Sequence, residues 1–141
     1  MDLPGSRRLG ASALLGRLGE LFIADRLREA TQLWSFPCPV EVAGELTVMK
    51  DAEELEAFFR SRHDRARAAG MTALVPRIIA IEMPRKHRFR VWLRWVHHFD
   101  THDEEEEHTS VFYFVRKPWG GLSIEMMDIV RLPDVGRAQS A

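Results

Sequence analysis

The chain has 141 residues, 45% of them hydrophobic and 29% charged, which is typical of one soluble globular domain. Its formal net charge is −1, so no overall positive field would recruit nucleic acid or an anionic membrane. The uncharged apolar runs are shorter than the ~20 residues of a membrane-spanning helix, so we expect a cytoplasmic protein with no membrane or nucleic-acid partner.

The N-terminal region predicts one long helix. Ser12 can cap a helix that runs to about Leu33, with leucines at helical spacing. Gly16 and Gly19 either weaken this helix slightly or allow another backbone to approach it closely. The ten residues before it are expected to form a loose tail.

A second helix is predicted after a proline-rich link. Pro37 and Pro39 favour an extended connection, followed by a short strand or loop over 40–48. The sequence D-A-E-E at 51–54 is a capping box that starts the helix, and Gly70 is a favourable residue to end it.

Cys38 and His63 have reactive side chains, but for each of them a structural role is expected and not a functional one. The single cysteine, Cys38, excludes an internal disulfide and suits a reducing compartment. We expect it to be a small buried hydrophobic residue and not a nucleophile. His63 lies in the charged run R-S-R-H-D-R-A-R, and we expect it on the surface.

The second half of the chain predicts strands only. They are expected at 74–83, 88–99, 108–117 and 122–132. Pro76 would confine its strand to an edge or bulge. Pro133 is expected to end the last strand, so the ordered core should cover about 12–132. Residues 1–11 and 133–141 would be tails. The whole chain, 1–141, is expected to form a single domain.

The strand over 88–99 has the clearest pattern. It reads R-F-R-V-W-L-R-W-V-H-H-F, with apolar and basic residues on alternate sides. The apolar side holds Phe89, Val91, Leu93 and Trp95, and the other side holds Arg88, Arg90 and Arg94. This period of two is typical of a half-buried antiparallel strand.

The element order predicts an α+β fold with helices on one side of an antiparallel sheet. In the strand over 108–117, Phe112 and Phe114 alternate with Val111, Tyr113 and Val115, so both faces are apolar. One face would cover the helices. The other face needs a second partner, and a homodimer through the sheet is the simplest.

The chain resembles the nuclear transport factor 2-like superfamily, also called SnoaL-like or ketosteroid isomerase-like. The resemblance covers roughly Ser12 to Leu132. It rests on the long first helix, the link F-P-C-P-V and the second-helix start D-A-E-E-L. It rests also on the strand pattern F-R-V-W-L-R-W, S-V-F-Y-F-V-R-K and G-G-L-S-I-E-M-M.

This resemblance implies a cone-shaped, cystatin-like roll, with helices packed in the concave face of a curved antiparallel sheet. A pocket between helices and sheet would bind a small apolar molecule without a cofactor. The expected lining is Trp34, Phe58, Phe59, Trp95, His97, Tyr113, Met126 and Asp128. The alternatives are a cofactor-independent isomerase, dehydratase or hydrolase acting on a small hydrophobic substrate, and a protein-interaction module that uses the sheet face.

Three residues are candidates for catalysis. Asp128 shares the alternation of Ile124 and Met126, so burial would raise its pKa toward the range of a general acid or base. His97 continues the apolar side of its strand and could be the partner or the base. Tyr113 could donate to a developing oxyanion. If these residues have structural roles only, Asp128 pairs with an arginine, His97 is solvated and Tyr113 is part of the core.

A weak metal candidate follows. His98, Asp100 and His102 alternate, with Asp103 and His108 nearby, and alternating residues of an extended segment point the same way. The spacing matches no established zinc signature, and a solvated hairpin tip is the preferred interpretation.

The basic side of the strand over 88–99 interleaves Arg90 and Arg94 with Trp92. Such a surface could bind single-stranded nucleic acid. The net charge and the neighbouring acidic loop favour a protein partner instead, since arginine and tryptophan are enriched at protein interfaces. We therefore expect these three residues at the dimer interface.

Overall fold

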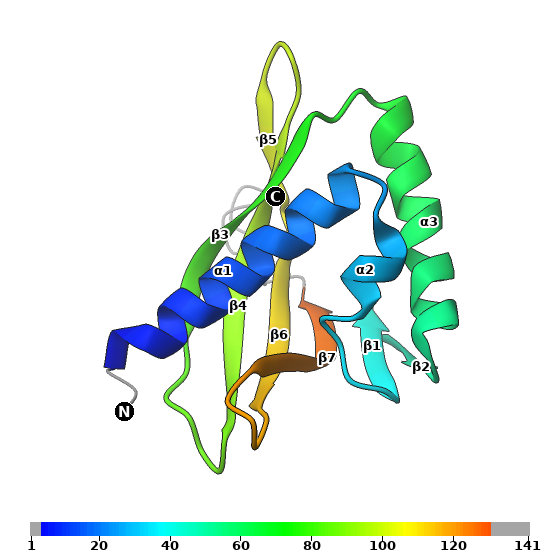
Figure 1. Cartoon of the computed structure of the whole chain (residues 1–141). Helices are drawn as coiled ribbons and strands as arrows, with labels where there is room; N and C mark the ends of the chain where they lie inside the picture. The colour runs from blue at the N-terminus through cyan, green and yellow to red at the C-terminus, as the bar shows by residue number, and fades with distance from the viewer. Residues whose placement is uncertain (1–3, 131–141) are drawn as a thin grey trace, which may run out of the picture.

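The computed structural model describes residues 4–130, with side chains from residue 10 onward. Three helices lie on one face of a curved sheet of seven strands (Figure 1). The helices are α1 (Pro4–Ile23), α2 (Leu27–Thr31) and α3 (Ala52–Ala68). The strands are β1 (Cys38–Val42), β2 (Glu45–Met49), β3 (Ala73–Ile81), β4 (Arg88–His98), β5 (Asp103–Glu105), β6 (Thr109–Arg116) and β7 (Leu122–Val130). The α+β class is therefore confirmed.

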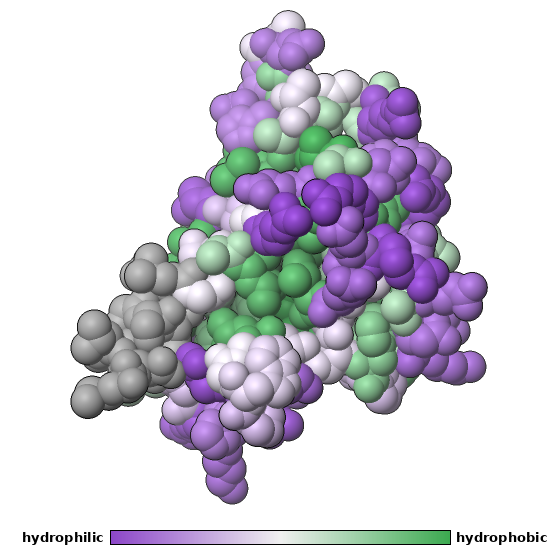
Figure 2. Space-filling view, in the orientation of Figure 1, coloured by the Kyte–Doolittle hydropathy of each residue, from purple (hydrophilic) through white to green (hydrophobic). Residues whose placement is uncertain are grey.

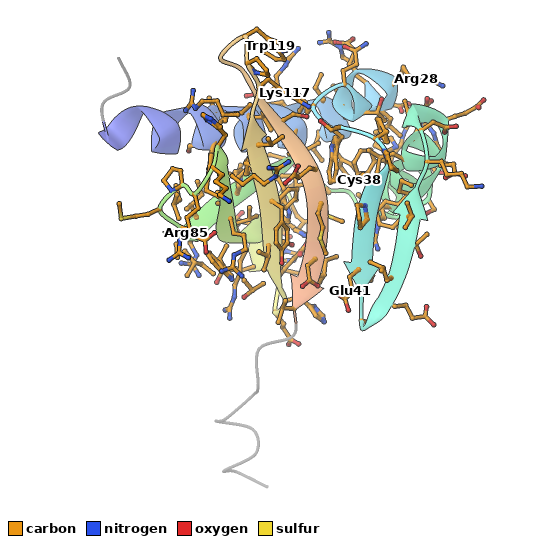
Figure 3. All side chains as sticks on the ribbon, turned by 90° about the horizontal axis from the view of Figure 1, so that it is seen from below. Arg28, Cys38, Glu41, Arg85, Lys117 and Trp119 are labelled. Carbon is orange, nitrogen blue, oxygen red and sulfur yellow. The ribbon has the colours of Figure 1, made fainter. Side chains whose placement is uncertain are left out.

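The sheet is mixed, whereas an antiparallel sheet was predicted. Its order is β2-β1-β7-β6-β4-β3, with β5 paired to β4. All pairs are antiparallel except that β1 lies parallel to β7. The β1–β2 hairpin therefore extends the sheet beyond β7 (Figure 3). β3 is an edge strand, as Pro76 predicted.

The first helix differs from its prediction at both ends. It begins at Pro4, and proline is favoured at a first helical position, so residues 4–11 are not the expected tail. It ends at Ile23, where the chain turns through Asp25 at φ 60° and restarts as α2. The predicted tail at 133–141 lies outside the described residues. No helix of the described chain is long and apolar enough to cross a membrane.

Gly19 allows α1 to lie close against the sheet. A Cβ atom placed on Gly19 would stand 2.1 Å from the backbone oxygen of Leu74 in β3. A Cβ on Gly16 would meet nothing within 4 Å. Of the two glycines, only Gly19 therefore lies so close to another backbone that a side chain would not fit.

The start and end of α3 confirm the local predictions. The Glu54 amide donates to Asp51 Oδ1 at 3.0 Å, and Glu54 Oε1 accepts from the Lys50 amide at 2.7 Å. Gly70 follows the helix at φ 81°. The prediction for His63 is wrong: it is buried and meets the Phe22 ring edge-on at 5.7 Å, because α1 covers this side of α3.

The sheet face that carries the helices is called the inner face, and the opposite one the outer face. The apolar side of β4 lies wholly in the core, as its alternation predicted. Phe89 stacks on Phe114 of β6 at 5.4 Å, which joins the two strands through their buried side chains on the inner face. Figure 2 shows hydrophobic surface at the centre of the helix side and hydrophilic surface over α3 and the β4–β5 tip.

Candidate functional site

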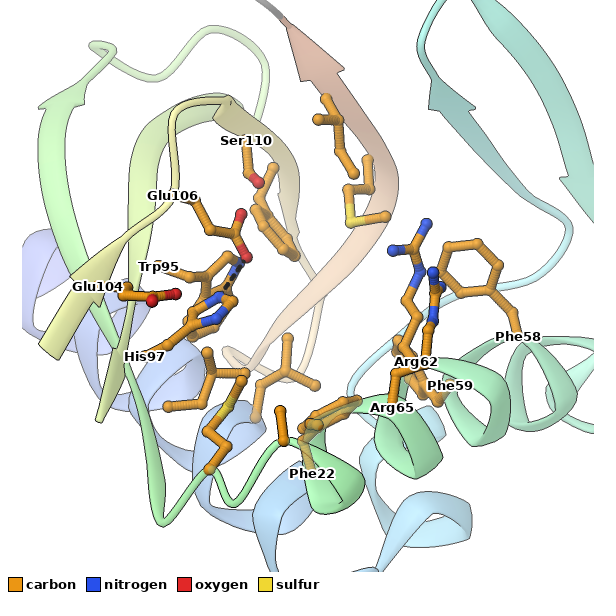
Figure 4. Close-up of a pocket in the computed structure, with 18 of the residues that line it drawn as sticks. Phe22, Phe58, Phe59, Arg62, Arg65, Trp95, His97, Glu104, Glu106 and Ser110 are labelled. Atoms are coloured by element: carbon orange, nitrogen blue, oxygen red, sulfur yellow. Dashed lines mark hydrogen bonds and ion pairs between the residues drawn. The ribbon is translucent and has the colours of Figure 1, made fainter. Parts of the chain in front are cut away.

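A cavity of about 430 Å³ lies between the helices and the inner face of the sheet. α1, α3 and all the long strands contribute to it (Figure 4). Seven Phe and Trp side chains line it. Six of them form its aromatic wall: Phe22, Trp34, Phe58, Phe59, Trp95 and Phe112; the seventh, Phe99, follows β4. Four of the predicted lining residues, Trp34, Phe58, Phe59 and Trp95, therefore meet here.

The aromatic wall is a connected cluster. Trp34 lies 6.0 Å from Phe59 and 5.8 Å from Phe112, measured between ring centroids. Trp95 meets Phe112 edge-on at 6.1 Å. Such tilted and edge contacts hold the rings at fixed angles and present a stable apolar surface. The buried indole N–H of Trp34 has no acceptor among the described residues.

One side of the cavity entrance is an acidic wall with a histidine. His97 Nε2 lies 2.7 Å from Glu106 Oε1, and both side chains are partly buried. Glu104 lies beside them and bonds His102 Nε2 at 3.0 Å. His97 thus lines the cavity as predicted. Glu106 reaches it because the β4–β5 hairpin folds back, with the Glu106 amide donating to the Trp95 carbonyl.

The other side of the entrance is basic. Arg62 and Arg65 project from α3 toward the cavity, and Figure 4 shows both across from His97 and Glu106. Arg62 is half-buried and lies over the Phe58 ring, with Cζ 4.4 Å from the centroid. Burial lowers the pKa of Arg62, the neighbouring Arg65 lowers it further, and Glu106 opposes this.

A bulge in β7 changes which residues reach the cavity. Tyr113 of β6 pairs with Met126, but the next residue, Phe114, pairs with Ile124. Glu125 is therefore one extra residue in β7. Such an extra residue shifts the alternation, so that the side chains beyond it change faces.

The predicted face of Asp128 is consequently wrong. Ile124 and Met127 both lie in the core, and Met127 and Ile129 line the cavity. Asp128 and Met126 alternate with these residues and lie on the outer face, and neither lines the cavity. Ile124 and Asp128 would share one face, as expected, only if the strand had no bulge.

Tyr113 also lies on the outer face. It alternates with the core residues Phe112 and Phe114, and it pairs with Arg90 of β4. It is therefore absent from the cavity wall. Of the three catalytic candidates, the structure brings only His97 to the cavity.

The predicted interface residues share the outer face. The Arg90 guanidinium lies 4.9 Å from the Trp92 ring centroid and bonds Glu82 Oε2 at 2.5 Å. Arg94 Nε donates to Thr109 Oγ1 at 3.4 Å. These contacts place Arg90, Trp92 and Arg94 side by side on one surface, as the alternation predicted.

The weak metal candidate is not assembled. His98 Nδ1 pairs with Asp103 Oδ1 at 2.6 Å, while His102 pairs with Glu104 and stacks on Phe99. Within residues 4–130, no group of three or more His, Cys, Asp or Glu side chains could hold a metal ion. Asp100 and the two histidines thus belong to the hairpin tip.

Cys38 is fully buried next to the sheet core, as expected. Burial, with a smaller contribution from Glu125, raises its pKa to about 12. A thiol with this pKa stays protonated at neutral pH, so Cys38 is not an activated nucleophile.

Arg62, Arg65 and Glu106 were not among the predicted site residues. The charged run R-S-R-H-D-R-A-R, which contains Arg62 and Arg65, predicts a solvated helix surface and no site. One signal was available in the sequence: Arg62 follows Phe58 and Phe59 by four and three residues, so it shares their helical face. No comparable signal marks Glu106, which reaches His97 only through the strand pairing of β5.

Comparisons with known proteins agree with this fold. A family model described as NTF2-like protein (DUF6841) matches residues 11–128. No curated protein matches the chain. Aln2 from a Streptomyces species is 15% identical, with 98% of this chain and 99% of that chain covered and a TM-score of 0.71.

Two further solved structures have the same fold. An NTF2-like protein with a cystatin-like fold from Novosphingobium aromaticivorans is 15% identical, with 99% and 97% of the two chains covered and a TM-score of 0.66. A protein from Catenulispora acidiphila in complex with S-DNPA is 7% identical, with 97% and 99% covered and a TM-score of 0.66. At these identities the likeness concerns the fold alone.

Proposed function

We propose that this chain, which belongs to the NTF2-like family described as DUF6841, binds a small, mostly apolar molecule in the cavity. The observation that carries the proposal is the cavity of about 430 Å³ lined by seven Phe and Trp side chains. Ligand sites have this character: concave, largely apolar and with a few polar groups that fix orientation. The protein of this fold from Catenulispora acidiphila was solved in complex with S-DNPA, which supports the proposal.

Filling the cavity tests this proposal. Ser110 is buried and lines the cavity, so Ser110→Leu would occupy the space that a ligand needs. We expect an apolar fluorescent probe such as 1-anilinonaphthalene-8-sulfonate to bind the wild type and to lose about tenfold or more in affinity in the variant. Thr109→Val is the matched control, because Thr109 is equally buried but does not line the cavity. Equal binding by all three proteins would contradict the proposal.

The second candidate function is proton transfer by His97. The observation that favours it is the 2.7 Å contact between His97 Nε2 and Glu106 Oε1 at the cavity wall. A carboxylate that holds one ring nitrogen orients the imidazole and leaves Nδ1 free to accept a proton from a bound substrate. The reaction classes remain isomerisation, dehydration or hydrolysis of a small hydrophobic molecule, with no cofactor.

A carbon-acid probe tests this candidate without knowledge of the natural substrate. The elimination of 5-nitrobenzisoxazole requires only a base in an apolar site. We expect the wild type to accelerate it, with the acceleration lost in His97→Gln and reduced in Glu106→Gln. A wild-type rate equal to that of His97→Gln would rule out a base at this position.

We also propose that the outer face packs against a second copy of the chain. Leu46, Val48 and Val75 on this side of the sheet are each about half exposed or more, at 61%, 47% and 46%. Arg90 already bonds Glu82 and covers Trp92, so this surface suits a protein partner better than phosphate groups. Sedimentation should give a dimer that Trp92→Glu converts to a monomer. A wild-type monomer at high micromolar concentration would favour the alternative, an interaction module for a different protein.

A cytoplasmic location is part of the proposal. Cys38 is the single cysteine and is a free, buried thiol, which suits a reducing compartment. Fractionation of the native host, with an antibody against the chain, tests this placement; recovery from the extracellular fraction would contradict it.

A further inference from the structure

The entrance of the cavity holds two arginines of α3. Arg62 and Arg65 stand one turn apart on this helix, and both line the cavity. Within residues 4–130, neither forms an ion pair at 4 Å or less. In contrast, Arg26, Arg60 and Arg90 are each held by a carboxylate. Two like charges therefore stand beside an apolar cavity, with no carboxylate of the described chain at ion-pair distance.

Arg62 is the less solvated of the two. Arg62 is half-buried whereas Arg65 is exposed, and the Arg62 guanidinium lies over the Phe58 ring, with Cζ 4.4 Å from the centroid. Loss of water around the group, and repulsion from Arg65, both disfavour its charged form. A guanidinium nevertheless stays charged at neutral pH, so an anion that entered the cavity would relieve both costs.

The acidic wall offsets these costs only in part: Glu106 raises the pKa of Arg62, but no ion pair of the described chain joins the acidic wall to either arginine. Glu106 is engaged by His97 at 2.7 Å and Glu104 by His102 at 3.0 Å. Figure 4 shows the guanidinium groups of Arg62 and Arg65 across the cavity from this wall. The two sides of the entrance thus remain separate, with an open space between them.

We propose that the cavity ligand is an amphipathic carboxylic acid, with its apolar body against the aromatic wall and its carboxylate bound by Arg62, with Arg65 at the entrance. The inference rests on the proposed function, because it names the ligand class of the same cavity. Stacking on Phe58 occupies one face of the guanidinium and leaves its N–H edge available for a bidentate carboxylate. A carboxylate carries one negative charge, whereas a phosphate dianion would face stronger repulsion from Glu104 and Glu106.

The test compares acids with neutral amides of the same shape. The probes are 2-naphthoic acid against 2-naphthamide, and decanoic acid against decanamide, titrated by calorimetry into the full-length protein. We expect each acid to bind about tenfold to hundredfold more tightly than its amide, as a charged hydrogen-bonded contact predicts. Raising the salt concentration should weaken the acids and leave the amides unchanged.

Variants of the two arginines test which residue causes the preference for the acid over the amide. Arg62→Met keeps the length of the side chain and should abolish the preference for the acid while amide binding persists. Arg65→Met should reduce the preference, and Arg62→Lys should keep part of it, since a point charge remains without the bidentate fork. Arg67→Met is the control, because Arg67 lies on the same helix but does not line this cavity.

The possible results distinguish the carboxylate inference from the proposed binding function. Acid and amide binding the wild type equally would overturn the carboxylate inference and leave the apolar cavity site standing. A preference that survives Arg62→Met, or that disappears equally in Arg67→Met, would also overturn it. Failure of all four probes to bind would count against the proposed function itself.

Discussion

Ile124 and Asp128 lie on opposite faces of the sheet although they are four residues apart in one strand. Ile124 pairs with Phe114 and is fully buried in the core, whereas Asp128 pairs with Val111 on the outer face. The extra residue at Glu125 produces this change of face. It removes a carboxylate from the cavity and brings Met127 and Ile129 in.

Asp128→Asn should therefore leave the cavity unaffected. We expect unchanged binding of 2-naphthoic acid and an unchanged rate with 5-nitrobenzisoxazole, because Asp128 does not line the cavity. His97→Gln, on the cavity wall, should alter the rate. A larger effect of Asp128→Asn than of His97→Gln would show that β7 lacks the bulge.

Gly19→Ala should destabilise the protein strongly. Its new Cβ would stand 2.1 Å from the Leu74 carbonyl oxygen, so α1 would have to move away from β3. We expect a loss of about 1–3 kcal/mol or more in the free energy of unfolding, measured by urea denaturation. The matched control is Gly16→Ala, with nothing within 4 Å of the new Cβ. It should stabilise the helix by about 0.5–1 kcal/mol. Similar effects of the two changes would contradict this packing.

Asp51→Ala should weaken the start of α3. The change removes the acceptor that lies 3.0 Å from the Glu54 amide, and the typical loss is about 1 kcal/mol of stability. Asp51→Ser should keep most of the stability, since a hydroxyl also caps. Glu53→Gln, in the same first turn, should cost only a few tenths of a kcal/mol. Thermal unfolding of the four proteins provides the comparison.

Cys38 should make stability fall at alkaline pH. Its folded pKa is raised to about 12, above the ~8.5 of an unfolded thiol. Its contribution is therefore full below the unfolded pKa and is lost as pH rises from there toward the folded pKa. Unfolding by urea at neutral and alkaline pH should show a smaller decline for Cys38→Ala than for the wild type. Rapid reaction of the native thiol with a disulfide reagent would be inconsistent with its burial.

Several elements follow from the sequence because their causes are local. The alternation of β4 buries Phe89 to Trp95, and Asp51 caps α3, since both depend on residues a few positions apart. The α+β order and the family resemblance follow from the same periodic patterns. Part of the aromatic wall could likewise be predicted: Trp34, Phe58, Phe59 and Trp95 line the cavity as expected, whereas Phe22 and Phe112 were not predicted there.

The tertiary structure decided the rest, because it depends on pairing between distant segments. The parallel pairing of β1 with β7 and the bulge at Glu125 arise from strand register, which the pattern of one strand does not contain. The same applies to the fold-back of β5, which brings Glu106 to His97, and to the covering of His63 by α1. The alternation of apolar residues in the sequence indicates which strand faces are buried, except beyond the bulge at Glu125, where the faces of Met126 and Asp128 change. His97 and Arg62 face each other across the cavity because their strand and helix meet through tertiary contacts far apart in the chain, which no local pattern contains.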